Sequence, residues 1–171
     1  DCVEQGAKET LEAQQMTGLP IYPYSAIYAR EHDELPAYRA SYQANVDCSK
    51  AIDAAIRENY SDNRLNSTAV KQVVDRFGFD RTLMVLAATA RYKDRDPRIS
   101  NDNKKWASTI FVPDDKDVRG VDRTTAYVVG YAHPGLVNLF MREARRQAQQ
   151  PSIHQQLQQN FHSLAGNSGR R

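Results

Sequence analysis

The sequence has no apolar stretch approaching the about 20 residues that are needed to cross a bilayer. It has only two cysteines, Cys2 and Cys48, in 171 residues, and their separation is not that of metal ligands. Its 8 glycines and 7 prolines are too few for a collagen-like or low-complexity chain, and a formal net charge of +2 is too small to indicate nucleic acid or an acidic membrane as partner. These absences favour a soluble, reduced, cytoplasmic domain that buries a core without disulfides.

The alternative is an exported protein. In that case Cys2 and Cys48 could pair, and the sequences that begin at Asn59 and Asn66 match the pattern for N-glycosylation. No basic start followed by an apolar run of about 7 to 15 residues supports a secretory signal. We therefore favour the cytoplasmic interpretation.

Most familiar catalytic and cofactor motifs are missing. The sequence has no phosphate-binding glycine loop followed by Lys-Ser/Thr, no paired-glycine nucleotide fingerprint, no His-Glu-x-x-His, no Cys-x-x-Cys and no Gly-x-Ser-x-Gly. The spacing of its four histidines does not place two rings on one helical face. We therefore expect no metal and no cofactor, and we favour a protein that is not an enzyme.

Composition divides the chain into three parts. Residues 1–19 hold helix formers with few apolar anchors and predict a peripheral N-terminal helix, residues 20–148 predict a single globular domain, and residues 149–171 predict a glutamine-rich helix with a flexible tail. Acids outnumber bases over residues 1–34, and bases outnumber acids over residues 142–171. This polarity either steers a partner or only solvates two faces.

Apolar residues recur at helical spacing along much of the chain. We expect Ser25 to cap a short helix through Glu31, Asp33 to cap the longest helix, and Ser67 to cap a helix that Gly78 closes. The apolar run 83–88 predicts a buried central helix. Further helices are expected over residues 3–16, from His133-Pro134-Gly135 to Arg146, and from Pro151 to Leu164.

Strand signals are confined to residues 108–112 and 125–131, which flank a charged loop. They predict an antiparallel pair laid on the helices. The expected fold class is therefore α+β and mainly helical, with a helix-bundle-like core and a small two- or three-stranded antiparallel sheet. A DNA-binding helix-turn-helix is disfavoured, because the helix that would read the bases shows mainly aliphatic residues.

The polar segment from Asp94 to Trp106 carries the first candidate site. Asp94, Asp96 and nearby amides could supply oxygen ligands to a hard cation, but the glycine and closing glutamate of a calcium loop are absent. The alternating bases and Trp106 could instead bind phosphate and stack a base. In the structural alternative, Ser100 caps a short helix, Arg98 pairs with a nearby acid, and Trp106 is buried.

Two other places have residues that suit a site. His133 begins a helix, where exposed backbone N–H groups favour an anion beside a neutral imidazole, although the same residue could simply turn the chain into the helix. Tyr22, Tyr24 and Tyr28, together with Arg39, are of the kind that anchors protein interfaces. Packing of the short helix on the long one would explain these tyrosines equally well.

A family resemblance rests on several separated motifs between about residues 20 and 146: Pro20-Ile-Tyr-Pro-Tyr24, Phe77-Gly78, Asp96 with Arg98, Asn103, Lys104 and Trp106, and His133-Pro134-Gly135-Leu136. In these motifs the chain resembles an uncharacterised domain-of-unknown-function family from bacterial conjugative and integrative mobile elements. The resemblance implies a domain that often belongs to large multi-domain polyvalent proteins, alongside domains that blunt host defences. It implies no catalytic residues.

Our leading hypothesis is a non-enzymatic protein-interaction module of a mobile genetic element, and more specifically an inhibitor of host defence of the anti-restriction or anti-CRISPR type. The partner would be a protein. The binding residues we predict are Tyr22, Tyr24, Tyr28, Arg39, Asp96, Arg98, Asn103, Lys104 and Trp106.

Two alternatives remain open from the sequence. The first is a nucleic-acid-binding accessory domain that uses the bases of the polar segment and the C-terminal arginines. The second is a hydrolase or nuclease in which Asp94, Asp96 and His133 act together, which requires these side chains to converge in space.

Overall fold

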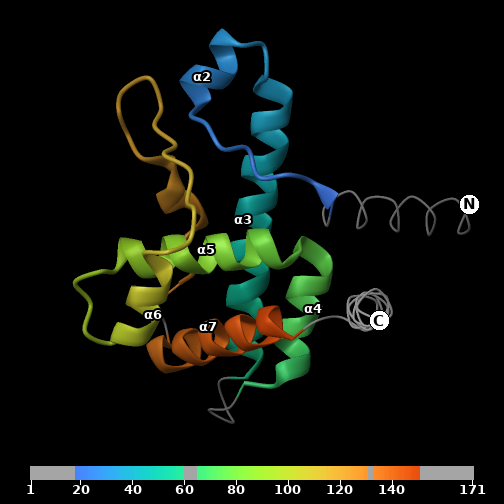
Figure 1. Ribbon diagram of the computed structural model, residues 1–171, viewed down its shortest axis with the longest axis vertical. Helices are drawn as coiled ribbons and strands as arrows, with labels where there is room; N and C mark the ends of the chain where they lie inside the picture. The colour runs from blue at the N-terminus through green and yellow to red at the C-terminus, as the bar shows by residue number, and fades with distance from the viewer. Residues whose placement is uncertain (1–17, 60–64, 131–132, 151–171) are drawn as a thin grey trace, which may run out of the picture.

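The computed structural model describes residues 18–59, 65–130 and 133–150 (Figure 1). The helices expected over residues 3–16 and 151–164 lie outside these ranges. None of the described helices is long and apolar enough to cross a membrane. The described elements are α2 (Ala26–Glu31), α3 (Leu35–Glu58), α4 (Ser67–Phe77), α5 (Phe79–Tyr92), α6 (Asn101–Ala107), the 3-10 helix η1 (Arg123–Tyr127) and α7 (Pro134–Gln149).

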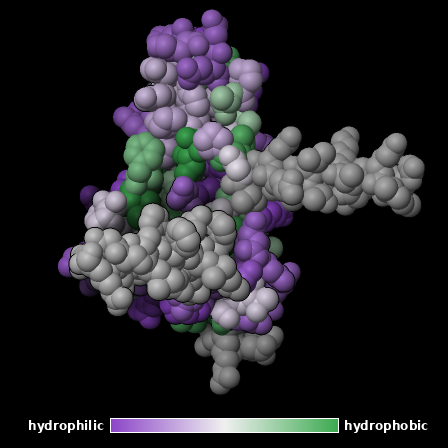
Figure 2. Space-filling view, turned by 45° about the vertical axis from the view of Figure 1, so that its right-hand side comes forward, coloured by the Kyte–Doolittle hydropathy of each residue, from purple (hydrophilic) through white to green (hydrophobic). Residues whose placement is uncertain are grey.

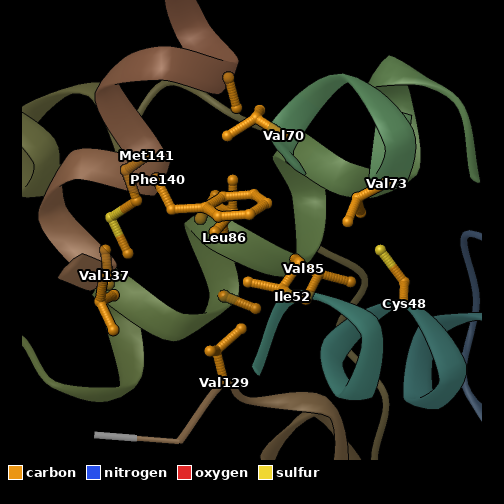
Figure 3. Packing of buried hydrophobic residues seen from close by; sticks show 14 of the residues in the cluster. Cys48, Ile52, Val70, Val73, Val85, Leu86, Val129, Val137, Phe140 and Met141 are labelled. Carbon is orange, nitrogen blue, oxygen red and sulfur yellow. The ribbon is translucent and has the colours of Figure 1, made fainter. Parts of the chain in front are cut away.

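Helix α5 is the centre of the fold, as its apolar sequence predicts. It packs against α3, α4, α6, α7 and η1, and Figure 1 shows it crossing α3, with α7 beneath it. The core gathers side chains from these helices (Figure 3). Apolar side chains that recur at helical spacing in α4 and α7 are buried: Val70, Val73, Val74 and Phe77, and Leu136, Val137, Phe140, Met141 and Ala144.

Two helix starts are as predicted and two are not. The hydroxyl groups of Ser25 and Ser100 accept hydrogen bonds from backbone N–H groups in the first turns of α2 and α6. At α4 the cap is Asn66, whose Oδ1 accepts from the Thr68 N–H at 2.9 Å. Asp33 does not cap α3 but adopts a φ of 55° in the turn before it, and Glu34 is the residue that precedes the helix.

A single glycine joins α4 to α5. Gly78 has φ 82° and ψ 158°, a conformation that a residue with a Cβ atom rarely adopts, and it serves as C-cap of one helix and N-cap of the next. The glycine was expected to close α4, and the structure confirms this. Because the ψ of Gly78 is extended, α5 begins at the next residue, Phe79.

The predicted antiparallel sheet is wrong, because the described residues contain no strand. The β pairing among these described residues is one isolated antiparallel bridge between Lys116 and Asp122. The fold over the described residues is therefore helical, and α+β is not its class. Residues 108–112 form turns and coil, and residues 123–127 form η1.

Side chains of α5 form hydrogen bonds with backbone groups that would have paired with each other in a sheet. The guanidinium of Arg91 on α5 donates to the carbonyl oxygens of Ala107, Ser108 and Ile110. The backbone N–H of Val129 donates to Thr89 Oγ1, also on α5, at 3.0 Å. Both segments are thus fixed to the central helix rather than to each other.

Cys48 is a buried free thiol in this core. Burial raises its pKa to about 12, with Thr82 and Arg81 acting in the opposite direction. The thiol is therefore protonated and unreactive at neutral pH. Cys2, its predicted partner in the exported alternative, lies outside the described residues.

Candidate functional site

Three charged residues of the polar segment, Asp96, Arg98 and Lys104, contact one another. The Asp96 carboxylate accepts from the Arg98 backbone N–H at 2.9 Å and from Arg98 Nη2 at 2.8 Å. These hydrogen bonds from Arg98 lower the pKa of Asp96 to about 2. Lys104 Nζ donates to the Asp96 backbone oxygen at 2.7 Å, while Asp94 is exposed in the turn after α5. Arg98, Asp96 and Lys104 thus form one local structural unit.

Asn138 on α7 holds this segment to the body of the protein. Its Oδ1 accepts from the Ser100 backbone N–H and from Asn103 Nδ2, both at 3.0 Å, and its Nδ2 donates to the Arg98 backbone oxygen at 2.8 Å. Asn103 is fully buried by these contacts. Asn103, which was predicted as a binding residue, therefore makes a buried contact that holds the polar segment to α7.

Replacing Asn138 by alanine should lower the free energy of unfolding by about 1 to 2 kcal/mol, because two part-buried donors and one acceptor lose their partner. Urea denaturation at pH 7 measures this loss. Asp94→Ala, at an exposed position of the same segment, is the control and should change stability by less than about 0.5 kcal/mol. Equal effects of the two substitutions would contradict the fastening role of Asn138.

Trp106 packs on the core and on α7. It is partly buried against the core cluster, and the Arg145 guanidinium lies 5.3 Å from the centre of its ring. Arg145 Nη1 also donates to Asp102 Oδ2 at 2.8 Å. The Trp106 ring, which was predicted to stack a base or anchor a partner, therefore already has the Arg145 guanidinium over it.

His133 serves as the N-cap of α7. Its Nδ1 accepts a hydrogen bond from the Leu136 backbone N–H at 3.2 Å. This bond requires an Nδ1 without a proton, so any proton on the neutral ring is on Nε2. The structure thus gives His133 the chain-turning role that the sequence left as an alternative to an anion site.

Tyrosines of the N-terminal part form a continuous cluster with Tyr127 of η1, which we call the tyrosine cluster. Tyr24 and Tyr28 lie 4.1 Å apart between ring centres, and Tyr28 stacks on His32 at 3.8 Å. Neighbouring rings elsewhere in the cluster meet nearly at right angles, at 82° for Tyr22 with Tyr24 and at 85° for Tyr22 with Tyr38. Its members are Tyr22, Tyr24, Tyr28, Tyr38, Tyr42 and Tyr127.

Hydrogen bonds position this cluster at the end of the molecule formed by α2 and the start of α3 (Figure 1). The Tyr22 backbone N–H donates to Ser41 Oγ at 2.9 Å, and its hydroxyl donates to Glu34 Oε2 at 2.6 Å. The Arg81 guanidinium, which is buried, donates to the backbone oxygens of Leu19 and Pro20. The segment that leads into the cluster is thereby tied to α3 and α5.

The structure adds a residue that sequence reasoning missed. Asp115 comes from the loop between α6 and η1, is only 4% exposed, and accepts from the Tyr38 hydroxyl at 2.7 Å through Oδ2. Its Oδ1 has no hydrogen-bond partner among the described residues. Burial raises the pKa of this carboxyl, while the Tyr38 hydroxyl, the Ala26 backbone N–H and Arg123 act in the opposite direction. Burial therefore disfavours the charged form of the Asp115 carboxyl.

Asp115→Asn should raise the free energy of unfolding at pH 7, because it removes a buried charge while an amide oxygen can still accept from Tyr38. A carboxyl whose pKa is raised in the folded state binds its proton more tightly there. The wild type therefore gains stability as pH falls toward that pKa, and the advantage of the variant should shrink over the same range. Urea titrations of both proteins between pH 7 and pH 4 test this. A variant that is less stable than the wild type, or an advantage independent of pH, would contradict it.

Exposed apolar side chains lie on the loop that carries Asp115. Val118 and Val121 are 67% and 53% exposed, and Tyr24 is 48% exposed. Figure 1 shows this loop rising beside α2, and Pro113 and Asp115 line a cavity together with Tyr22 and Tyr24. In the space-filling view the tip of this end is hydrophilic and paler side chains lie below it (Figure 2). Arg39, on the first half of α3, is exposed as predicted.

The described residues contain no group of three or more His, Cys, Asp or Glu side chains that could hold a metal ion. Residues 21–149 match the model of a protein family with the description "Protein of unknown function (DUF3849)". No curated protein and no solved structure matches the chain.

Proposed function

Since the chain belongs to the family described as a protein of unknown function (DUF3849), whose description specifies no activity, we propose from the geometry that it is a non-enzymatic protein-interaction module. The tyrosine cluster and the loop beside it form its partner surface. One observation carries this proposal: six tyrosines form one continuous cluster in which Tyr24 is about half exposed, and the loop that carries the exposed Val118 and Val121 meets this cluster at Asp115.

Tyrosine suits this role for a physical reason. It buries a large rigid surface at a small entropy cost and keeps a hydroxyl for a polar contact, which makes it frequent at the energetic centre of interfaces. The cluster is also held in place before any partner arrives, through the bonds of Tyr22 to Ser41 and Glu34. A preorganised surface loses less freedom on binding.

The setting of this module is the finer part of the proposal. The resemblance to domains of conjugative and integrative elements supports a module that a mobile element delivers to a host. A host defence protein of the restriction or CRISPR type is then the partner class we propose.

A comparison of two exposed tyrosines tests the proposed surface. Tagged wild type, Tyr24→Ala and the matched control Tyr92→Ala, at a residue 56% exposed at the end of α5, would capture partners from lysate of a bacterial host. We expect a discrete partner that the wild type and Tyr92→Ala retain and Tyr24→Ala loses at least tenfold. The purified partner should reproduce this ranking in a binding titration.

Variants of the polar segment complete the test. Arg98→Glu and Trp106→Ala should leave capture of that partner unchanged, because both residues have internal contacts. Loss of capture by these two variants while Tyr24→Ala binds normally would overturn the proposed surface. Capture of DNA or RNA that weakens steeply with salt would instead favour the nucleic-acid alternative.

A further inference from the structure

The tyrosine cluster lines a small, half-open cavity. The centre of a water-sized sphere can occupy about 10 Å³ of it, which is room for about one water-sized group. Aromatic rings make up most of its wall, and its polar lining comes from three further side chains. The lining residues are Tyr22, Tyr24, Tyr38, Tyr42 and Tyr127, with Ser41, Asn45, Pro113 and Asp115.

Within this lining, Asp115 is the acceptor that lacks a partner. Ser41 Oγ and Asn45 Oδ1 both accept from the Arg81 guanidinium, at 3.1 Å and 2.8 Å. Asp115 Oδ2 accepts from Tyr38, and the Ala26 backbone N–H also acts on the carboxylate, but Oδ1 has no hydrogen-bond partner among the described residues although the side chain is only 4% exposed. An unpaired buried carboxylate oxygen costs free energy, so its natural complement is a donor that enters the cavity.

Charge favours a cationic donor. A hydrogen bond to a carboxylate is strongest when the donor is itself charged, and tyrosine rings attract a cation that lies over their faces. Arg123 acts on Asp115 electrostatically, but it is exposed and does not line the cavity.

The dimensions restrict the cation. Room for about one water-sized group fits a primary ammonium, whereas a guanidinium or a trimethylammonium group is several times larger. Tyr24, which is about half exposed, connects this wall to the proposed partner surface, and Glu31, Asp33 and Glu34 are exposed at the turn between α2 and α3. The acidic turn favours a basic segment, although Arg30 and Arg39 add two positive charges nearby.

We propose that this cavity receives the primary ammonium group of a lysine side chain of the protein partner, with an ammonium N–H donating to Asp115 Oδ1. The inference rests on the proposed function and names the partner's anchor. It also gives a reason for keeping a buried carboxylate that lowers stability: its Oδ1 gains a hydrogen-bond donor only in the complex.

Titration of the full chain with Nα-acetyl-lysine N-methylamide tests the inference. At constant ionic strength, we expect saturable shifts of the tyrosine ring signals in the NMR spectrum. The same compound acetylated on its side-chain nitrogen, guanidinium chloride at non-denaturing concentration, and tetramethylammonium chloride should each produce shifts at least tenfold weaker. These comparisons use only the wild type, so they do not depend on the folding of any variant.

Two variants then assign the site. Asp115→Asn should weaken binding of the lysine compound at least tenfold, whereas Asp114→Asn, at an exposed neighbouring carboxylate, should bind as the wild type does. Ammonium chloride separates recognition of a lysine side chain from that of the free ion: equal affinity for both would overturn the lysine assignment. Absence of saturable binding, with the cavity holding only water, would also overturn it.

The two proposals fail separately. If Asp115→Asn captures the partner as strongly as the wild type while Tyr24→Ala loses it, the lysine anchor is wrong and the interaction surface stands. If neither substitution changes capture, the surface itself is wrong.

Discussion

Replacing Arg81 by alanine should lower the free energy of unfolding by about 3 to 5 kcal/mol, a larger loss than we expect at any exposed charge. The guanidinium is 1% exposed and donates four hydrogen bonds, to Asn45 Oδ1, Ser41 Oγ and the backbone oxygens of Leu19 and Pro20. Alanine leaves all four acceptors without this donor and opens a cavity between α3 and α5. Denaturation by urea, monitored by circular dichroism, measures the loss.

Two further substitutions define the origin of this effect. Arg81→Lys should recover only part of the lost stability, because an ammonium group cannot reproduce the fork of guanidinium donors. Arg57→Ala removes an exposed arginine that pairs with Asp53 one helical turn away, and should cost about 0.5 kcal/mol or less. If Arg81→Ala costs no more than Arg57→Ala, the guanidinium does not tie the N-terminal segment to the fold.

The same arginine connects stability to the proposed surface. It holds the carbonyl groups of residues 19 and 20, and it shares Ser41 Oγ with the Tyr22 backbone N–H. Arg81→Lys should therefore weaken partner capture even under conditions where it remains folded. A core substitution that leaves this network intact should not.

Phe140→Ala should lower the free energy of unfolding by about 3 to 5 kcal/mol. The ring is completely buried and lies in the core beside Leu86 and Val70, between α7, α5 and α4 (Figure 3). Alanine removes most of the side chain and leaves a cavity that the packed helices can fill only in part. Guanidinium chloride denaturation of the purified variant gives the value.

The adjacent residue on α7 provides a matched control. Leu139 is 40% exposed, so Leu139→Ala should cost less than about 1 kcal/mol. Similar losses at positions 139 and 140 would contradict the packing described for α7. Because Phe140 does not line the tyrosine cavity, Phe140→Ala should retain affinity for the partner whenever it is folded.

Periodicity was enough to predict most of the described helices. Val70, Val73, Val74 and Phe77 recur on one face of α4, and a face of this kind must be buried against other helices. The prediction of short strands was wrong because β-branched residues only indicate a possible pairing. Arg91 and Thr89, which take the backbone groups of those segments, come from a helix that lies 16 to 40 residues away in sequence.

The site was predictable only in part. Tyr22, Tyr24 and Tyr28 were identified as a group because they lie close in sequence, whereas Tyr38 and Tyr42, which lie further along the chain on α3, were not grouped with them. Asp115 gave no signal in a loop crowded with aspartates. Its distinction is burial, which arises only when Tyr38, 77 residues earlier, packs against it.

The polar segment shows the opposite outcome. Its mixture of acids, amides and bases suggested a ligand site, yet these groups mostly bind one another: Asp96 binds Arg98, and Asn138 binds Asn103. A sequence gives the donors and acceptors of such a segment but not their pairing. Here the bonds fix the segment to α7 and support the helix that carries Trp106.

Photo-crosslinking at two exposed tyrosine positions tests the central claim most directly. A benzophenone amino acid would replace either Tyr24 or Tyr92, which are 48% and 56% exposed, and each protein would be irradiated with the purified partner. If the tyrosine cluster is the partner surface, the probe at position 24 should form a one-to-one adduct, and the probe at position 92 should form none. An adduct at position 92 with none at position 24 would contradict the claim.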